Sequence, residues 1–156
     1  MNLAEETVKL LIKKGRTLAT AESCTGGKLA ASVVDVSGAS ACFYGGYVTY
    51  ANEAKEQMIH VSGDTLKAYG AVSEQTAREM AAGTLKTTGA DYALSTTGIA
   101  GPGGGTEKKP VGLVYIACGG KEGIRVTENH FSGSREEIRN AAVKKALELL
   151  TEALKS

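Results

Sequence analysis

Apolar side chains recur at helical spacing at both ends of the chain. In residues 3–14 four apolar positions share one face, and Gly15 follows where a helix would end. In residues 135–154 six apolar positions share one face, and Gly133-Ser134 precedes them as a start signal. The pattern predicts an amphipathic helix at each end of the chain.

Between these helices, short apolar or alternating segments predict strands. They lie at residues 17–21, 43–50, 90–97, 111–118 and 124–131. Glycines at 119, 120 and 123 separate the last two, which favours an antiparallel hairpin.

Helical patterns fill the spaces between the first strands. They cover residues 29–34, 52–60, 62–69 and 73–87, with Asn52, Ser62 and Ser73 as the expected N-caps of the last three. This alternation predicts an α/β fold with helices on both faces of a mixed sheet. Without a linker, low-complexity tract or internal repeat, we expect residues 1–156 to form one domain.

Composition narrows the function classes. The 18 basic and 17 acidic residues leave a net charge of +1 without long charge runs, and there is no Trp for base stacking. These features argue against a nucleic-acid or polybasic membrane surface. Three cysteines without a CxxC motif, no signal peptide and no apolar run of membrane-spanning length lead us to expect a cytoplasmic protein.

The first candidate site is Ala21-Glu22-Ser23-Cys24-Thr25-Gly26-Gly27, where a strand passes into a helix. A hydroxyl on such a turn can point into a cleft, and the backbone N–H groups that follow can hold a phosphate or a developing oxyanion. Ser23 and Thr25 can equally serve only as helix caps. Cys24 is an alternative nucleophile, since a helix N-terminus would lower its thiol pKa, although a buried core role suits it as well.

A serine nucleophile needs a base. The two histidines, His60 and His130, lie outside the glycine-rich loops, and His130 falls within a predicted strand. Lys55 is the better candidate, and Tyr50 precedes it at the end of a strand. A lysine base requires a pKa lowered from about 10.4 to about 7–8. The competing interpretation is a solvated helix lysine paired with a carboxylate.

Two further segments offer anion-binding groups. Residues 96–105 place many backbone N–H groups after a strand, as in an anion nest or a surface loop. Arg135 and Arg139, near the start of the last helix, can grip a phosphate or simply be solvated. Asp occurs only at 35, 64 and 91, and no cluster has metal-ligand spacing, so we expect no metal.

Taken together, several segments strongly resemble the CinA C-terminal-domain family across nearly the whole chain. They are TAESCTGG (20–27), FYGGYVTYANEAK (43–55), GAVSEQTAREMA (70–81), TTGIAGPGGG (96–105), KPVGLVYIA (109–117) and FSGSREEIRNAA (131–142). The chain departs from the family at Ser37-Gly38-Ala39-Ser40, where PGSS is frequent, and at Ser134, where an acidic residue is frequent. Because the resemblance starts at the first residues, we expect a stand-alone version of the domain.

The resemblance implies a three-layer α/β/α sandwich and a metal-independent, cofactor-free amidohydrolase. The implied reaction converts nicotinamide mononucleotide (NMN) and water to nicotinate mononucleotide and ammonia, in pyridine nucleotide salvage. Ser23 is the implied nucleophile, with assistance from Tyr50 and Lys55. The expected substrate and phosphate contacts are Thr25, Gly26, Gly27, Gly46, Thr97, Gly98, Ile99, Ala100, Gly101, Arg135 and Arg139.

Two hypotheses therefore follow. In the first, the chain is an enzyme whose partner is the small molecule NMN, with neither nucleic acid nor membrane, and it forms a homo-oligomer. In the second, it is a catalytically silent nucleotide-binding or protein-interaction module linked to competence and DNA uptake. Retention of Ser23, Tyr50 and Lys55 together favours the enzyme.

Overall fold

A computed structural model describes all residues, 1–156. Five strands form one mixed sheet in the order β2-β1-β3-β4-β5. Strands β1 (Leu18–Glu22), β2 (Phe43–Val48) and β3 (Tyr92–Gly98) are parallel. Strands β4 (Leu113–Gly120) and β5 (Gly123–His130) continue the sheet as an antiparallel hairpin. The parallel half therefore brings three carboxyl ends of strands to one edge of the sheet.

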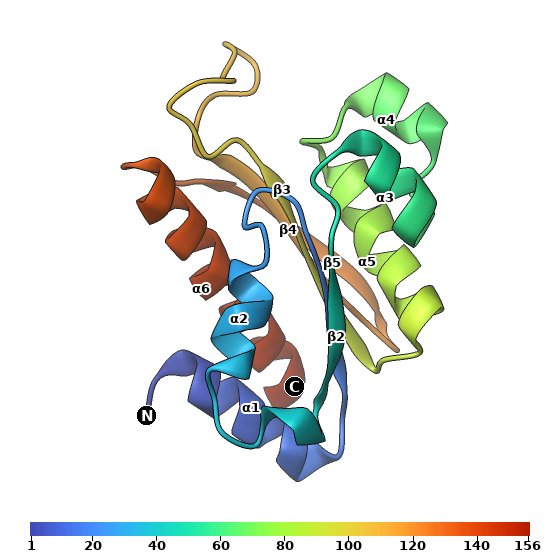
Figure 1. Cartoon of the computed structure of the whole chain (residues 1–156), viewed down its shortest axis with the longest axis vertical. Coiled ribbons are helices and arrows are strands. Elements are labelled where there is room, and N and C mark those ends of the chain that lie inside the picture. Colours follow the sequence, from blue (N-terminus) through green and yellow to red (C-terminus); the bar gives the residue numbers. More distant parts are fainter.

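One face of the sheet is covered by α1 (Leu3–Lys14), α2 (Lys28–Val34) and α6 (Arg135–Lys155), as Figure 1 shows. A core cluster of 21 buried residues, rich in Leu, Ile and Val, fills this interface. A short 3₁₀ turn, Ala39–Ala41, connects α2 to β2. Burial of this many branched side chains is the main favourable contribution to the fold.

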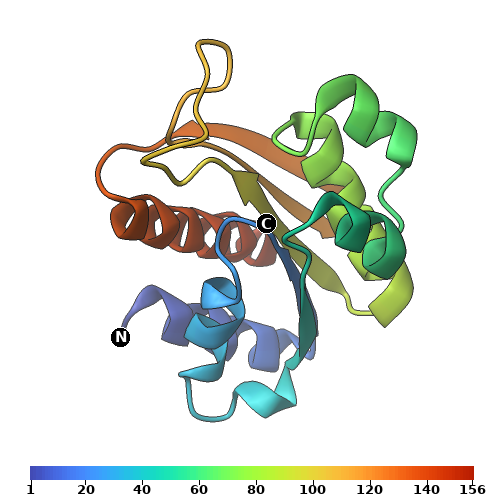
Figure 2. The same cartoon turned by 45° about the horizontal axis from the view of Figure 1, so that its top comes forward.

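The opposite face packs against α5 (Glu74–Thr88), while α3 (Asn52–Ile59) and α4 (Gly63–Tyr69) lie against α5 (Figure 2). Small side chains dominate here, with one cluster made only of buried alanines: Ala77, Ala81, Ala93 and Ala117. Helices on both faces of a five-stranded mixed sheet confirm the predicted three-layer α/β/α architecture.

Every predicted helix and strand is present, with ends that shift by one or two residues. The Ser73 and Ser134 hydroxyls accept the expected capping bonds from Thr76 N–H and Glu137 N–H. The cap prediction at Asn52 was wrong, because Ala51 holds the extended N-cap conformation and Asn52 is the first helical residue. No helix is both long enough and apolar enough to cross a membrane.

Candidate active site

The carboxyl ends of the three parallel strands open into a cleft of about 280 Å³. The β1–α2 turn, the segment before α3, the α4–α5 connection, the loop after β3 and the start of α6 form its walls. Nine of the residues expected to form the site line it. They are Ser23, Tyr50, Lys55, Thr97, Gly98, Ile99, Ala100, Gly101 and Arg135.

The central contact of the cleft joins Ser23 to Lys55. The Lys55 Nζ lies 3.1 Å from the Ser23 Oγ, so no side chain is needed to relay a proton between them. Nζ also donates to the carbonyl oxygens of Thr49 at 2.8 Å and Tyr50 at 3.3 Å. Ser23 is 8 % exposed and Lys55 only 1 %. The alternative of a solvated surface lysine was therefore wrong.

The surroundings of Lys55 favour its neutral form. It makes no ion pair with any carboxylate, and its contacts are uncharged oxygens. Burial lowers the pKa of Lys55 below its ordinary value of 10.5. A neutral amine has two N–H bonds and one lone pair. If the two carbonyls take the hydrogens, the lone pair remains for the hydroxyl proton of Ser23.

The turn that carries Ser23 is fixed by Glu22, a residue that our sequence analysis did not single out. Its buried carboxylate accepts bonds from Leu29 N–H at 2.8 Å, Ala30 N–H at 3.0 Å and the Thr25 hydroxyl at 2.6 Å. The amino end of α2 is thus already paired with a protein anion. Glu22 lies on the same face of β1 as Leu18 and Thr20, and every residue of this strand is buried. Its place at the end of a buried strand was the available signal.

Several backbone N–H groups around the cleft have no partner within the protein. They belong to Cys24 and Thr25 in the β1–α2 turn, and to Ala100 and Gly101 in the loop after β3. The Ile99 N–H, by contrast, is used by the Leu113 carbonyl at 2.9 Å. The turn and the loop can each supply donors to an oxyanion or a phosphate oxygen.

Cys24 is a poor nucleophile despite lying beside Ser23. Its side chain is 6 % exposed, and burial raises the pKa of its thiol to about 11. The expectation that a helix N-terminus would lower this pKa was wrong, because desolvation of the thiolate outweighs the nearby backbone N–H and Arg139. Cys24 remains a thiol near neutral pH.

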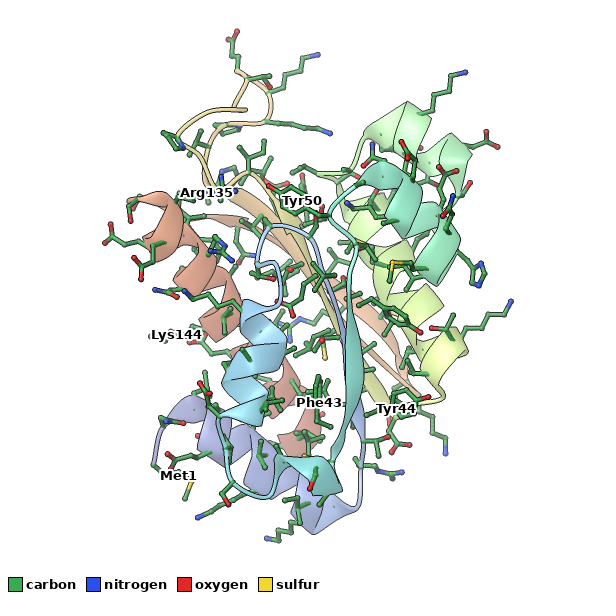
Figure 3. All side chains as sticks on the ribbon, in the orientation of Figure 1. Met1, Phe43, Tyr44, Tyr50, Arg135 and Lys144 are labelled. Atoms are coloured by element: carbon green, nitrogen blue, oxygen red, sulfur yellow. The ribbon has the colours of Figure 1, made fainter.

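Tyr50 and Arg135 form the outer wall of the cleft and lie side by side in Figure 3. The Arg135 guanidinium donates to the Gly101 carbonyl at 2.7 Å and to the Tyr50 hydroxyl at 3.3 Å. Tyr50 is 63 % exposed, and its hydroxyl is bonded to Arg135 rather than to Lys55 or Ser23. This arrangement suits contact with a substrate better than proton transfer to serine.

The other five expected site residues do not line the cleft: Thr25, Gly26, Gly27, Gly46 and Arg139. The Thr25 hydroxyl bonds to Glu22 and Thr96. Gly46 leaves room for the Thr20 hydroxyl, which an added Cβ would strike. The lining residues that the sequence did not mark include Ala71 and Val72, whose segment was only part of a family motif.

Neither histidine reaches the cleft. His60 ends α3 in a left-handed conformation, and His130 bonds to Glu128 on exposed β5. No group of three or more His, Cys, Asp or Glu side chains is arranged to hold a metal ion.

Known proteins resemble this chain over most of its length. It is 53 % identical to a CinA-like protein of Syntrophomonas wolfei over 94 % of the chain, but spans only 35 % of that protein's length. It is 50 % identical to the nicotinamide-nucleotide amidohydrolase PncC of Escherichia coli, covering 96 % of this chain and 92 % of that protein.

Solved structures have the same fold. The competence/damage inducible protein CihA of Agrobacterium tumefaciens superposes with a TM-score of 0.92 at 43 % identity, over 100 % of this chain and 98 % of the other. A CinA superfamily protein of Klebsiella pneumoniae gives 0.95 at 38 % identity, over 98 % and 96 %. The family model for the CinA C-terminal domain matches residues 1–154. The chain therefore belongs to the CinA C-terminal domain family.

Proposed function

We propose that residues 1–156 form one amidohydrolase domain that converts NMN and water to nicotinate mononucleotide and ammonia. The observation that carries this proposal is the 3.1 Å contact between the Ser23 Oγ and a Lys55 Nζ whose other contacts are backbone carbonyls. A hydroxyl beside a buried amine without a carboxylate partner is an activated nucleophile with its base. The PncC relative, which acts on nicotinamide nucleotide, supports the substrate.

In the first step, the Ser23 Oγ attacks the carboxamide carbon as Lys55 accepts the hydroxyl proton. The free N–H groups of Cys24 and Thr25 lie next to the nucleophile and are suited to stabilise the oxyanion. When the C–N bond breaks, Lys55 returns the proton to the leaving nitrogen and ammonia departs. The nicotinoyl group is then held as an ester of Ser23.

In the second step, water attacks the ester while Lys55 accepts a proton from it. Collapse of the second tetrahedral intermediate expels the Ser23 oxygen, which recovers its proton from Lys55. The product acid releases its remaining proton to solvent and leaves as the carboxylate. The same two side chains therefore serve both halves of the reaction, as a serine–lysine arrangement requires.

The 5′-phosphate needs a cation or free N–H groups at the cleft. Arg139 bonds backbone carbonyls outside the cleft, and Glu22 occupies the amino end of α2. Arg135 and the loop after β3 remain at the mouth. We assign phosphate recognition to this outer wall.

The proposal is tested by incubating purified protein with NMN and measuring ammonia and nicotinate mononucleotide. Free nicotinamide and NAD share the carboxamide, so they serve as alternative substrates. Free nicotinamide lacks the ribose phosphate, and in NAD the phosphate is part of a diphosphate. We expect equal amounts of both products from NMN. Tight binding of NMN without any ammonia would instead favour the silent nucleotide-binding module.

A further inference from the structure

The guanidinium of Arg139 reaches from α6 to the turn that follows the nucleophile. Its Nε donates to the Cys24 carbonyl at 3.0 Å, and its Nη2 donates to the Thr25 carbonyl at 2.8 Å. Arg139 makes no ion pair with a carboxylate. Its hydrogen bonds therefore all go to two consecutive carbonyls of this turn.

Each of these carbonyls shares its peptide unit with the N–H group of the next residue, so holding the carbonyl also orients that N–H group. In a trans peptide the C=O and the N–H point in opposite directions. The Cys24 carbonyl shares its peptide with the Thr25 N–H, which has no partner within the protein. Fixing the carbonyl toward α6 therefore fixes the Thr25 N–H on the side away from α6.

The Thr25 carbonyl orients the Cys24 N–H group indirectly, through one further hydrogen bond. The Thr25 carbonyl shares its peptide with the Gly26 N–H, which donates to the Ser23 carbonyl at 3.1 Å. The Ser23 carbonyl in turn shares its peptide with the Cys24 N–H, also without a partner. The one guanidinium thus sets the direction of both free N–H groups beside Ser23.

Gly26 gives the turn its left-handed conformation, with a φ of +56° that glycine tolerates. The Arg139 Nη2 packs at van der Waals distance from this residue, 3.4 Å from where a Cβ would lie. The guanidinium lies close against the turn as a planar fork, a geometry that lysine cannot reproduce.

We infer that Arg139 is a positioning residue that orients the Cys24 and Thr25 N–H groups as the oxyanion hole. The inference rests on the proposed function of Ser23. Arg139 touches neither the substrate nor the reacting atoms in this role, and it acts only through the two peptide units. It should therefore affect transition-state stabilisation much more than substrate binding.

The test compares Arg139→Met and Arg139→Lys with Arg125→Met, a matched control that removes an exposed arginine paired with Glu152. Loss of an oriented donor lowers kcat by about 10²–10³-fold. We expect a fall of about this size in Arg139→Met, partial recovery in Arg139→Lys, and little change in KM. Tm should fall modestly in Arg139→Met, because two carbonyls of the turn lose their donor. Inhibition by 3-pyridinylboronic acid, which forms a tetrahedral adduct with serine, should weaken in parallel with kcat.

A kcat for Arg139→Lys equal to that of the control would overturn the inference, and so would unchanged boronate inhibition. Arg139→Lys keeps the charge and the aliphatic stem, so it carries the test if Arg139→Met does not fold. If the wild-type protein releases no ammonia from NMN, the proposed function fails separately. The role of Arg139 is then tested by the rate at which a fluorophosphonate labels Ser23. Equal labelling rates in wild type and the Arg139 variants would contradict the positioning role.

Discussion

The two walls of the cleft differ in how their polar groups are held. On the inner wall, Ser23 and Lys55 are buried, and the Lys55 amine is bonded to the Ser23 hydroxyl and to two backbone carbonyls. Behind this wall, the buried Glu22 carboxylate holds the turn that carries Ser23. On the outer wall, Tyr50 and Arg135 are exposed and meet through one 3.3 Å bond. Burial lowers the pKa of a lysine, whereas exposure leaves room for a ligand to displace a weak bond. The proposed mechanism accordingly assigns the chemistry to the inner wall and substrate recognition to the outer wall.

The strongest way to break this comparison is Ser23→Ala. Loss of the nucleophile from a serine hydrolase lowers kcat by an amount on the order of 10⁶-fold, so turnover of NMN should disappear. The Ser23 hydroxyl is hydrogen-bonded to Lys55, so its loss should change stability by only about 1 kcal/mol. Ammonia release and thermal unfolding check both points. Full activity in Ser23→Ala, with loss in Cys24→Ala, would move the nucleophile to the thiol.

Lys55→Arg tests whether the inner wall needs a neutral base. Guanidinium stays protonated, so we expect a loss of about 10²–10⁴-fold, close to that of Lys55→Ala. In the wild type the lowered pKa of Lys55 makes kcat/KM rise with pH, because the amine loses its proton as the pH passes that pKa. The pH–rate profiles of wild type and variants measure this. Substantial activity in Lys55→Arg would rule out the general-base role.

Arg135→Gln should affect binding rather than chemistry. A lost charge-assisted bond is worth about 1.5–3 kcal/mol, so KM for NMN should rise about 10–100-fold with kcat retained. Nicotinamide riboside, which lacks the phosphate, should not respond to the change. Arg125→Gln at the far end of the sheet is the control. A fall in kcat without a change in KM would indicate that Arg135 contributes to the chemical step rather than to substrate binding.

Glu22→Gln addresses the stability of the inner wall. An amide cannot accept all three bonds, and leaving a buried donor unpaired costs about 1–3 kcal/mol. At about 2–4 °C per kcal/mol for a chain of this size, Tm should fall by several degrees. Glu53→Gln, at an exposed position in the first turn of α3, is the matched control. Equal Tm values for the two variants would show that the Glu22 carboxylate does not stabilise the turn.

The smallest expected effect is that of a chelator. The cleft is lined by neither carboxylate nor imidazole, and the one thiol there has a raised pKa. We therefore expect NMN turnover to survive prolonged EDTA treatment. Activity that disappears with EDTA and returns with Zn²⁺ or Mg²⁺ would contradict the serine–lysine chemistry.

The sequence by itself determined the elements and their layering. Period-3.6 and short apolar patterns located all the helices and strands, because each element must bury one face. The family motifs then led to Ser23, Tyr50 and Lys55. The cap prediction at Asn52 was wrong because the choice between Ala51 and Asn52 depends on backbone geometry after β2.

Only the tertiary structure decided what each polar residue contacts. Lys55 is a candidate base because its amine is buried and donates to the carbonyls of Thr49 and Tyr50. Composition cannot reveal that a lysine is buried. Arg139 lies 115 residues from Cys24, and packing of α6 against α2 brings them together. Such contacts depend on distance in space, and a one-dimensional pattern of polar and apolar residues does not encode it.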